Sequence, residues 1–322
     1  MSGGWRFRLM LVAAAVGWGC ATTATKYALA GFGPATMLVV KLAAASAVLW
    51  AVSLVRGVRP APGRGRFALL GLFEPALAYG GLTVGLTYTT ATNASLLGVT
   101  ESIFVLMLAA AFLSERIRAR SVLGIALAVA GVLALGGGDV GTGFNLGDLI
   151  VVAGSVAAAV YVTLAAKVAS TADALTMTTY QFTFATAFTL PLAVWPWLTG
   201  REPLPTSVEP RYWLAAMFVG GVCFALSFLL YNQAIRSVPA GMAGVILNMV
   251  PVIGVLTAVV FLGESLTAWH MAGAVLVVAG IMLFPAAKEQ LTRASSPAPG
   301  TAPGTPRTRR SGRPPSCSRR AA

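Results

Sequence analysis

Long apolar runs constrain this chain more than any other feature of its sequence. Of its 322 residues, 57% are hydrophobic and only 10% are charged, whereas about a quarter of the residues in a soluble domain are charged. A helix of roughly 20 residues crosses a hydrocarbon core about 30 Å thick. Apolar runs of about this length predict ten spans, at residues 9–30, 34–56, 67–88, 92–114, 119–137, 147–169, 173–198, 211–235, 239–262 and 267–286.

The spans are predicted to be α-helices. Their apolar residues are continuous rather than alternating, and a helix satisfies its own backbone hydrogen bonds in lipid. The first run follows the basic Arg8, lies close to a second span and lacks a clear cleavage site, so we interpret it as a retained helix rather than a signal peptide. The expected fold is an all-α integral membrane protein with ten transmembrane helices.

Part of the sequence occurs twice. Ala91 to Gly131 aligns with Ala240 to Gly280 without a gap, and 12 of the 41 positions are identical. A repeat in a strongly apolar chain is typical of a transporter built from two related halves with its site at their interface. Because each half has five predicted helices, we expect the halves to be inverted relative to each other in the membrane.

The distribution of charge supports this topology. A net charge of +13 would favour nucleic-acid binding in a soluble protein, but here the basic residues alternate between loops, so we expect no nucleic-acid partner. Glu115 is followed by three arginines, whereas its counterpart Glu264 is followed by no basic residue before the next span. Both termini are therefore predicted to be cytoplasmic. The arginines assigned to the inner side are Arg6, Arg8, Arg56, Arg59, Arg64, Arg66, Arg116, Arg118 and Arg120.

The repeat and the loop composition divide the chain into five predicted regions. The segment from Lys288 onward is rich in Pro, Ser, Thr and Arg and cannot bury a core, so we expect it to be disordered. The regions are a cytoplasmic N-terminus (1–7), a first five-helix repeat (8–137), a linker (138–146), a second five-helix repeat (147–287) and a basic cytoplasmic tail (288–322).

The residues that would build an enzyme or a metal site are scarce. The cysteines Cys20, Cys223 and Cys317 have no disulfide or metal-ligand spacing, and His270 is the only histidine. No phosphate-binding Gly-x-x-x-x-Gly-Lys-Ser/Thr loop occurs. We therefore expect neither an enzyme nor a cofactor.

Several short motifs carry a resemblance to a known family. The chain resembles the EamA-like ten-helix branch of the drug/metabolite transporter superfamily over residues 8 to about 286. The resemblance implies a carrier that works by alternating access and exports small metabolites, amino acids or drugs without an ATPase of its own. In one departure, Ser102 stands where the ninth span has Pro251, so the halves need not share a broken-helix geometry. The motifs are Gly17-Trp18-Gly19 with Lys26, Phe112-Leu113-Ser114-Glu115-Arg116, Gly147-Asp148 with Tyr161, and Pro251 through Leu262-Gly263-Glu264.

Glu101 is the charged residue predicted to lie nearest the middle of the membrane. It is about nine residues into the fourth span, or roughly 14 Å deep at 1.5 Å per residue. A charge in hydrocarbon is costly, so such a residue is a candidate for substrate or proton contact. The alternative is a structural ion pair with Lys41, which lies at a similar depth in the second span.

Two prolines mark candidate kinks or gates. Glu74 precedes Pro75 in the third span, where the proline removes a backbone hydrogen bond. A carboxylate at such a kink suits a gate, but Glu74 can also satisfy freed backbone groups or pair with a loop arginine. In the ninth span, Asn248 lies three residues before Pro251, and carbonyls freed by the proline can bind substrate.

The remaining polar residues each have a functional and a structural interpretation. Lys26 either snorkels to the interface or contacts substrate, and Trp18 either lines the cavity or packs in the core. Thr183 and Tyr180 belong to a polar face of the seventh span that either bonds to another helix or lines the path. Glu115 and Glu264 are expected to act as caps. Tyr88 and Asn93 complete the substrate candidates.

These observations predict a secondary-active transporter in the plasma (inner) membrane that exports small organic metabolites such as amino acids or drugs. Its expected partners are the substrate and the lipid bilayer, and we expect a monomer or a homodimer. An uncoupled facilitator is the first alternative. A non-transporting scaffold or a membrane enzyme is the alternative from another class.

Overall fold

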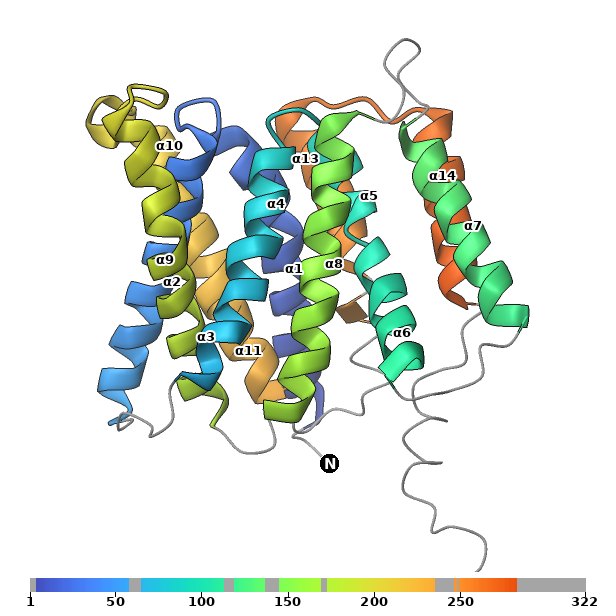
Figure 1. Cartoon of the computed structure of the whole chain (residues 1–322), viewed down its shortest axis with the longest axis horizontal. Coiled ribbons are helices and arrows are strands. Elements are labelled where there is room, and N and C mark those ends of the chain that lie inside the picture. The colour runs from blue at the N-terminus through green and yellow to red at the C-terminus, as the bar shows by residue number, and fades with distance from the viewer. Residues whose placement is uncertain are drawn as a thin grey trace, which may run out of the picture. The chain divides into compact units, whose positions relative to one another are not determined.

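The computed structural model describes residues 4–57, 65–112, 119–136, 145–168, 173–234, 246–247 and 249–282. Within these ranges every regular element is helical, and there is no strand. Figure 1 shows the helices running up and down side by side. Their bounds are α1 Gly4–Ala28, α2 Pro34–Val55, α3 Arg66–Gly71, α4 Ala78–Gly85, α5 Ala91–Leu97, α6 Thr100–Phe112, α7 Ala119–Gly136, α8 Leu146–Val168, α9 Ala174–Leu198, α10 Pro210–Phe218, α11 Ser227–Ala234, α13 Met249–Leu262 and α14 Ala268–Met282.

Five of the described helices are long and apolar enough to cross a membrane by length and composition. They comprise the stretches Trp5–Ala28, Pro34–Val55, Arg66–Gly85, Leu146–Ala165 and Pro210–Tyr231. Helices also occupy the other predicted spans wherever the structure describes them. The first helix begins before its predicted start, because Arg6 and Arg8 lie on its first turns, where long basic side chains can reach the interface.

Three of the predicted spans are interrupted rather than continuous. A π-helical segment, Leu72–Leu77, joins α3 to α4, and Glu74 within it has the extended angles φ −143° and ψ 122°. The turn of Gly98 and Val99 separates α5 from α6. A second π-helical segment, Val219–Leu226, joins α10 to α11. Pro75 indicated the kink in the third span. The other two stretches contain no proline and were expected to be uninterrupted, because hydrophobicity does not record a break that neighbouring helices can satisfy.

Helices from the two halves of the sequence pack against each other. α2 lies beside α9, α4 beside α8, α1 beside α13, and α7 beside α14. Small residues allow these backbones to approach closely. At Gly131 of α7, for example, an added Cβ would lie 2.7 Å from the carbonyl oxygen of Gly273 in α14.

The largest buried apolar cluster joins α1, α2, α9, α10 and α11. Phe182 of α9 contacts the rings of Phe224 and Phe228, and all three are buried. A second cluster joins α4, α5, α8 and α13 around Leu86 and Leu97. Both clusters therefore combine residues from the two halves.

Candidate functional site

The breaks in the third and fourth spans bring two carboxylates together. Glu74 lies in the π-helical segment after α3, and Glu101 lies in the first turn of α6 directly after the α5–α6 break. Glu74 is buried and Glu101 is half-buried, and the two side chains lie close enough to interact electrostatically. Interrupted helices near the centre of a bundle are where transporters commonly bind substrates and ions.

The fourth span breaks without a proline. The amide of Glu101 donates to the carbonyl of Gly98 at 3.2 Å, and the amide of Ser102 donates to that of Val99 at 3.2 Å. These bonds span three residues, so this turn is tighter than an α-helix. The Thr100 hydroxyl donates to the Leu97 carbonyl at 2.6 Å. Local bonds of this kind allow the helix to break at Gly98 without a proline. The fourth span has Ser102 at the position where the ninth span has Pro251.

Three polar side chains surround Glu74. The Tyr79 hydroxyl donates a hydrogen bond to the Glu74 carboxylate. Gln181 of α9 donates from Nε2 to the backbone carbonyl of Glu74 at 2.7 Å. Tyr161 of α8 in turn donates to Oε1 of Gln181 at 3.5 Å. Glu74 therefore bonds to a tyrosine, and Gln181 satisfies the carbonyl at the kink.

Aromatic side chains form the neighbourhood of Glu101. Tyr231 of α11 interacts electrostatically with both Glu101 and Glu74. Its ring lies 5.3 Å from that of Trp18 in α1, and Trp18 also contacts Phe228 edge-on at 5.2 Å. The indole N–H of Trp18 is buried and has no hydrogen-bond partner among the described residues. Trp18 thus packs in the core beside Tyr231 and Phe228, and its indole donor is unpaired among the described residues.

The proposed ion pair between Lys41 and Glu101 does not form. Lys41 is fully buried in α2, and its ammonium group donates to the Thr83 hydroxyl at 2.6 Å and lies 5.5 Å from the centre of the Phe224 ring. In the described part of the chain no lysine or arginine forms a salt bridge with Glu74 or Glu101. Lys41 and Glu101 were predicted to lie at a similar depth in the membrane, but a similar depth does not ensure contact. Lys41 faces α4 and the π-helical segment before α11 instead.

The polar face of α9 attaches this helix to α2. The Thr183 hydroxyl accepts a bond from the indole of Trp50 at 2.9 Å and lies 3.2 Å from the Ser46 hydroxyl. Tyr180 is buried between the rings of Trp50 and Phe67. These contacts favour the structural interpretation for both residues: Thr183 bonds α9 to α2, and Tyr180 packs against Trp50 and Phe67.

The candidates near the helix ends lie apart from the carboxylates. Tyr88 follows α4 and is 59% exposed. The Oδ1 of Asn93 accepts a hydrogen bond from Nε2 of His270 at 2.9 Å. Pro251 lies in α13, close to the first residue at which that helix is described. Asn248 and Glu115 lie outside the described residues.

The residues that surround Glu74 were not predicted from the sequence as site residues. Tyr79 and Gln181 were not among the candidates, and Tyr161 appeared only within a motif. A glutamine inside an apolar span is a usable signal, because a buried amide requires hydrogen-bond partners. Tyr79 carried no such signal, since a tyrosine is ordinary in a membrane helix.

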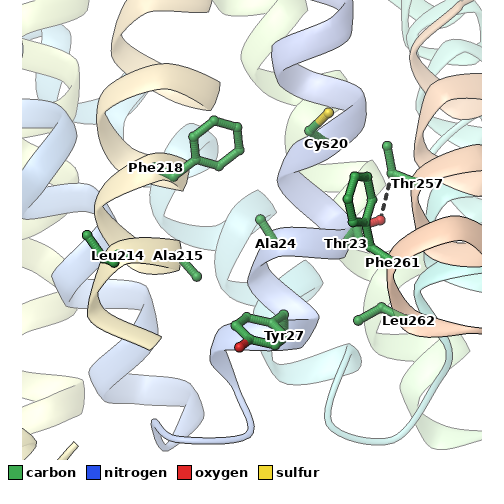
Figure 2. A pocket seen from close by; sticks show the side chains of 10 residues that line it. All are labelled: Cys20, Thr23, Ala24, Tyr27, Leu214, Ala215, Phe218, Thr257, Phe261 and Leu262. Atoms are coloured by element: carbon green, nitrogen blue, oxygen red, sulfur yellow. Dashed lines mark hydrogen bonds between the residues drawn. The ribbon is translucent and has the colours of Figure 1, made fainter. Parts of the chain in front are cut away.

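A pocket of about 470 Å³ lies elsewhere, between α1, α10 and α13. Figure 2 shows the ten side chains that line it and the bond between Thr23 and Thr257 at one side. No lysine, arginine or carboxylate lines this pocket. Phe261 and Leu214 at its edge are 76% and 71% exposed. The pocket is therefore an apolar recess at the helix surface, separate from Glu74 and Glu101.

Comparison with known proteins identifies the family. The EamA-like transporter family matches residues 6–137 and again residues 145–284. This chain belongs to the EamA-like transporter family. The two matched segments correspond to the two halves that the sequence repeat indicated.

EamA-like relatives are named as transporters. YetK from Bacillus subtilis, an uncharacterised transporter, is 30% identical over 68% of this chain and 66% of its own length. A probable terminal-alkyne amino-acid exporter from Streptantibioticus cattleyicolor is 27% identical over 85% of this chain and 91% of its own. One crystal structure shares the fold, with a TM-score of 0.59 at 22% identity over 90% of this chain and 99% of the other.

Proposed function

We propose that this EamA-like protein is a secondary-active transporter that moves small amine-bearing organic solutes, such as amino acids, outward across the cell membrane. The observation that carries the proposal is the pair Glu74 and Glu101. Two carboxylates lie together inside the bundle, each at a helix break, with no described cation bonded to either.

The electrostatics of this pair favour exchange with a ligand. Two carboxylates close together in apolar surroundings repel each other, and either a proton or a cationic group relieves the repulsion. The adjacent rings of Tyr231 and Trp18 offer faces to which an ammonium group is attracted. The free indole donor of Trp18 suits an acceptor on the substrate, such as a carboxylate. An amine that carries a carboxylate fits both features.

The choice of an amino-acid-like substrate and of export has independent support. The relative from Streptantibioticus cattleyicolor is named as a probable amino-acid exporter and matches most of both chains. Proton antiport is the form of coupling that the carboxylate pair supports best, since one site can bind either a proton or the substrate ammonium. An uncoupled facilitator is the alternative.

We propose that transport proceeds by alternating access between two inverted five-helix repeats with ten spans in all. The two family matches and the packing of first-half against second-half helices support two repeats. The arginines after Glu115 and their absence after Glu264 support opposite orientations.

The topology can be tested with reporter fusions. A fluorescent protein at the C-terminus should fold and fluoresce, because that end is assigned to the cytoplasm. Alkaline phosphatase inserted at Pro203, in the loop between α9 and α10, should be active, because that loop is assigned to the outside. Two inactive reporters would invert the whole assignment. Activity of one reporter without the other would place both sites on the same side of the membrane and contradict ten spans.

Flux in proteoliposomes tests the transport proposal. The purified full-length chain should accumulate labelled amino acids or amines when an outward-directed proton gradient is imposed, and dissipating the gradient should abolish the accumulation. Downhill flux that ignores the gradient would identify a facilitator. Absence of flux for amino acids and for amine-bearing drugs would contradict the proposed substrate class.

A further inference from the structure

Three charged residues of the sequence motifs lie outside the proposed transport site and bind the same short segment. Lys26 ends the first-span motif, Asp148 follows Gly147 at the start of the sixth span, and Glu264 follows the ninth span. All three contact residues 86–92, the connection between α4 and α5 together with the first turn of α5. We call this connection the α4–α5 segment.

Lys26 binds the end of α4. Its ammonium group donates to the carbonyl oxygen of Leu86 at 2.5 Å and to that of Thr89 at 2.8 Å. Carbonyls at the C-terminal end of a helix have no partners within the helix and carry partial negative charge. The two interpretations open from sequence were snorkelling to the interface and substrate contact, and neither included this binding of backbone carbonyls at a helix end.

Glu264 binds the start of α5. Its two carboxylate oxygens accept from the amides of Ala91 at 2.8 Å and Thr92 at 2.7 Å. These amides lack partners within the helix and carry partial positive charge. Glu264 was expected to cap a helix, but the helix that it caps belongs to the first half of the chain and is not the α14 that follows it.

Asp148 binds the middle of the segment. It is almost fully buried at the start of α8 and accepts a bond from the Thr89 hydroxyl at 2.5 Å. The Asn145 amide donates to the same carboxylate at 3.2 Å, and the Asp148 amide donates in return to Oδ1 of Asn145 at 2.9 Å. Thr89 is thus held through its hydroxyl by α8 and through its carbonyl by α1.

The three contacts form one electrostatic unit. A cation lies against the negative end of α4 and an anion lies against the positive end of α5, and Lys26 and Glu264 also attract each other. Lys26 and the segment belong to the first family match, whereas Asp148 and Glu264 belong to the second. Separation of the two halves at this end requires these charge-assisted bonds to break.

A second glutamate makes the same kind of contact at the same end. Glu202, in the loop after α9, accepts from the amides of Ala35 and Thr36 at 3.0 Å each, and from the Thr36 hydroxyl at 2.6 Å. It thereby joins the second half to the start of α2. Glu202 and Glu264 each connect a loop of the second half to a helix start of the first half.

We propose that Lys26, Asp148 and Glu264 are positioning residues that clamp the α4–α5 segment and hold the outer end of the transport path closed. The role of the clamp rests on the proposed transport function. The assignment of this end to the outer side of the membrane rests on the distribution of arginines among the loops. The clamp itself predicts a measurable change in accessibility that needs no substrate. Failure of transport and failure of the clamp can therefore be observed separately.

Cysteine labelling in nanodiscs tests the clamp. In a background with Cys20, Cys223 and Cys317 replaced by alanine, Thr25→Cys reports on the clamped end, because Thr25 is fully buried in α1 and lies outside the segment itself. Ser53→Cys, buried in α2 near its other end, reports on the opposite side. A water-soluble maleimide should label Thr25→Cys about tenfold faster when Glu264→Gln is added, since each charge-assisted bond holds the closed state by more than a factor of ten.

The controls separate opening from unfolding. Lys26→Met should act like Glu264→Gln, whereas Glu209→Gln at the same end should leave the rate unchanged, because Glu209 is exposed and bonds only locally to Arg211. Labelling of Ser53→Cys should stay constant or slow, whereas unfolding would accelerate both reporters. Equal labelling of Thr25→Cys with and without Glu264→Gln overturns the clamp.

A second measurement covers the case in which the cysteine-free background does not fold. Hydrogen–deuterium exchange of the chain with its native cysteines compares the wild type with Glu264→Gln. Faster exchange at the end of α1 and the start of α2, as well as in α5, supports opening of the whole end. Faster exchange confined to the first turn of α5 reduces Glu264 to a local cap and overturns the proposal.

Discussion

Glu101→Gln should lower gradient-driven flux by about 100-fold or more, while substrate exchange without a gradient persists. The amide keeps the shape and the hydrogen-bonding capacity of the carboxylate but removes the group that exchanges protons. A loss of this size corresponds to about 2.7 kcal/mol at 25 °C, within the range for a charged partner in a buried site. Flux in proteoliposomes, driven by a pH gradient or measured as counterflow, gives the two readouts.

Glu74→Gln tests whether the two carboxylates act as one unit. Because Glu74 and Glu101 interact electrostatically, the double variant should lose little more than either single variant, which is the behaviour of coupled residues. Glu209→Gln, which alters an exposed carboxylate, is the matched control and should transport normally. Gradient-driven flux that survives Glu101→Gln would exclude coupling through this residue and leave it a structural role.

Gly81→Ala combined with Gly85→Ala should destabilise the fold by several kcal/mol. An added Cβ at Gly81 would lie 2.9 Å from the Cα of Gly154, and at Gly85 it would lie 2.8 Å from the carbonyl oxygen of Gly147. Backbone atoms of α8 cannot move aside as a flexible side chain can, and overpacking costs about 1–3 kcal/mol at each site. The thermal midpoint in detergent, measured by fluorescence-detected size-exclusion chromatography, should fall clearly.

Gly80→Ala is the matched control for the contact between α4 and α8. It makes the same substitution on the same helix, but its added Cβ would meet only the Cδ2 atom of Leu38 at 3.4 Å. Alanine also raises helix propensity by about 1 kcal/mol over glycine. Gly80→Ala should therefore leave the midpoint unchanged or raise it. Equal losses for Gly80→Ala and Gly81→Ala would show that the close approach of α4 and α8 is not required.

The locations of the helices were predictable because they depend on local composition. A run of apolar residues is either long enough to cross lipid or not, and the structure places helices in each predicted span that it describes. The family was also predictable, because its motifs are short and local, and comparison confirmed it. Glu74 and Glu101 were identifiable as candidates because a charge in hydrocarbon is costly wherever it faces.

The partners of these residues depended on tertiary structure. Periodicity does not specify which neighbour a helix face meets, so Lys41 was considered for Glu101 and instead bonds to Thr83. Pro75 indicated a kink beside Glu74, but not that Gln181 of a distant helix satisfies the carbonyl freed there.

Sequence alone therefore determined that this chain is a helical membrane protein with two related halves and a few costly charges. Tertiary structure decided that two of those charges lie at helix breaks and interact electrostatically, and that Lys26 and Glu264 hold one segment from opposite halves. The physical reason is the distance in sequence over which each property is decided. Burial in lipid is a property of each segment by itself, whereas a hydrogen bond requires both partners within about 3 Å, and only the packed chain brings them there.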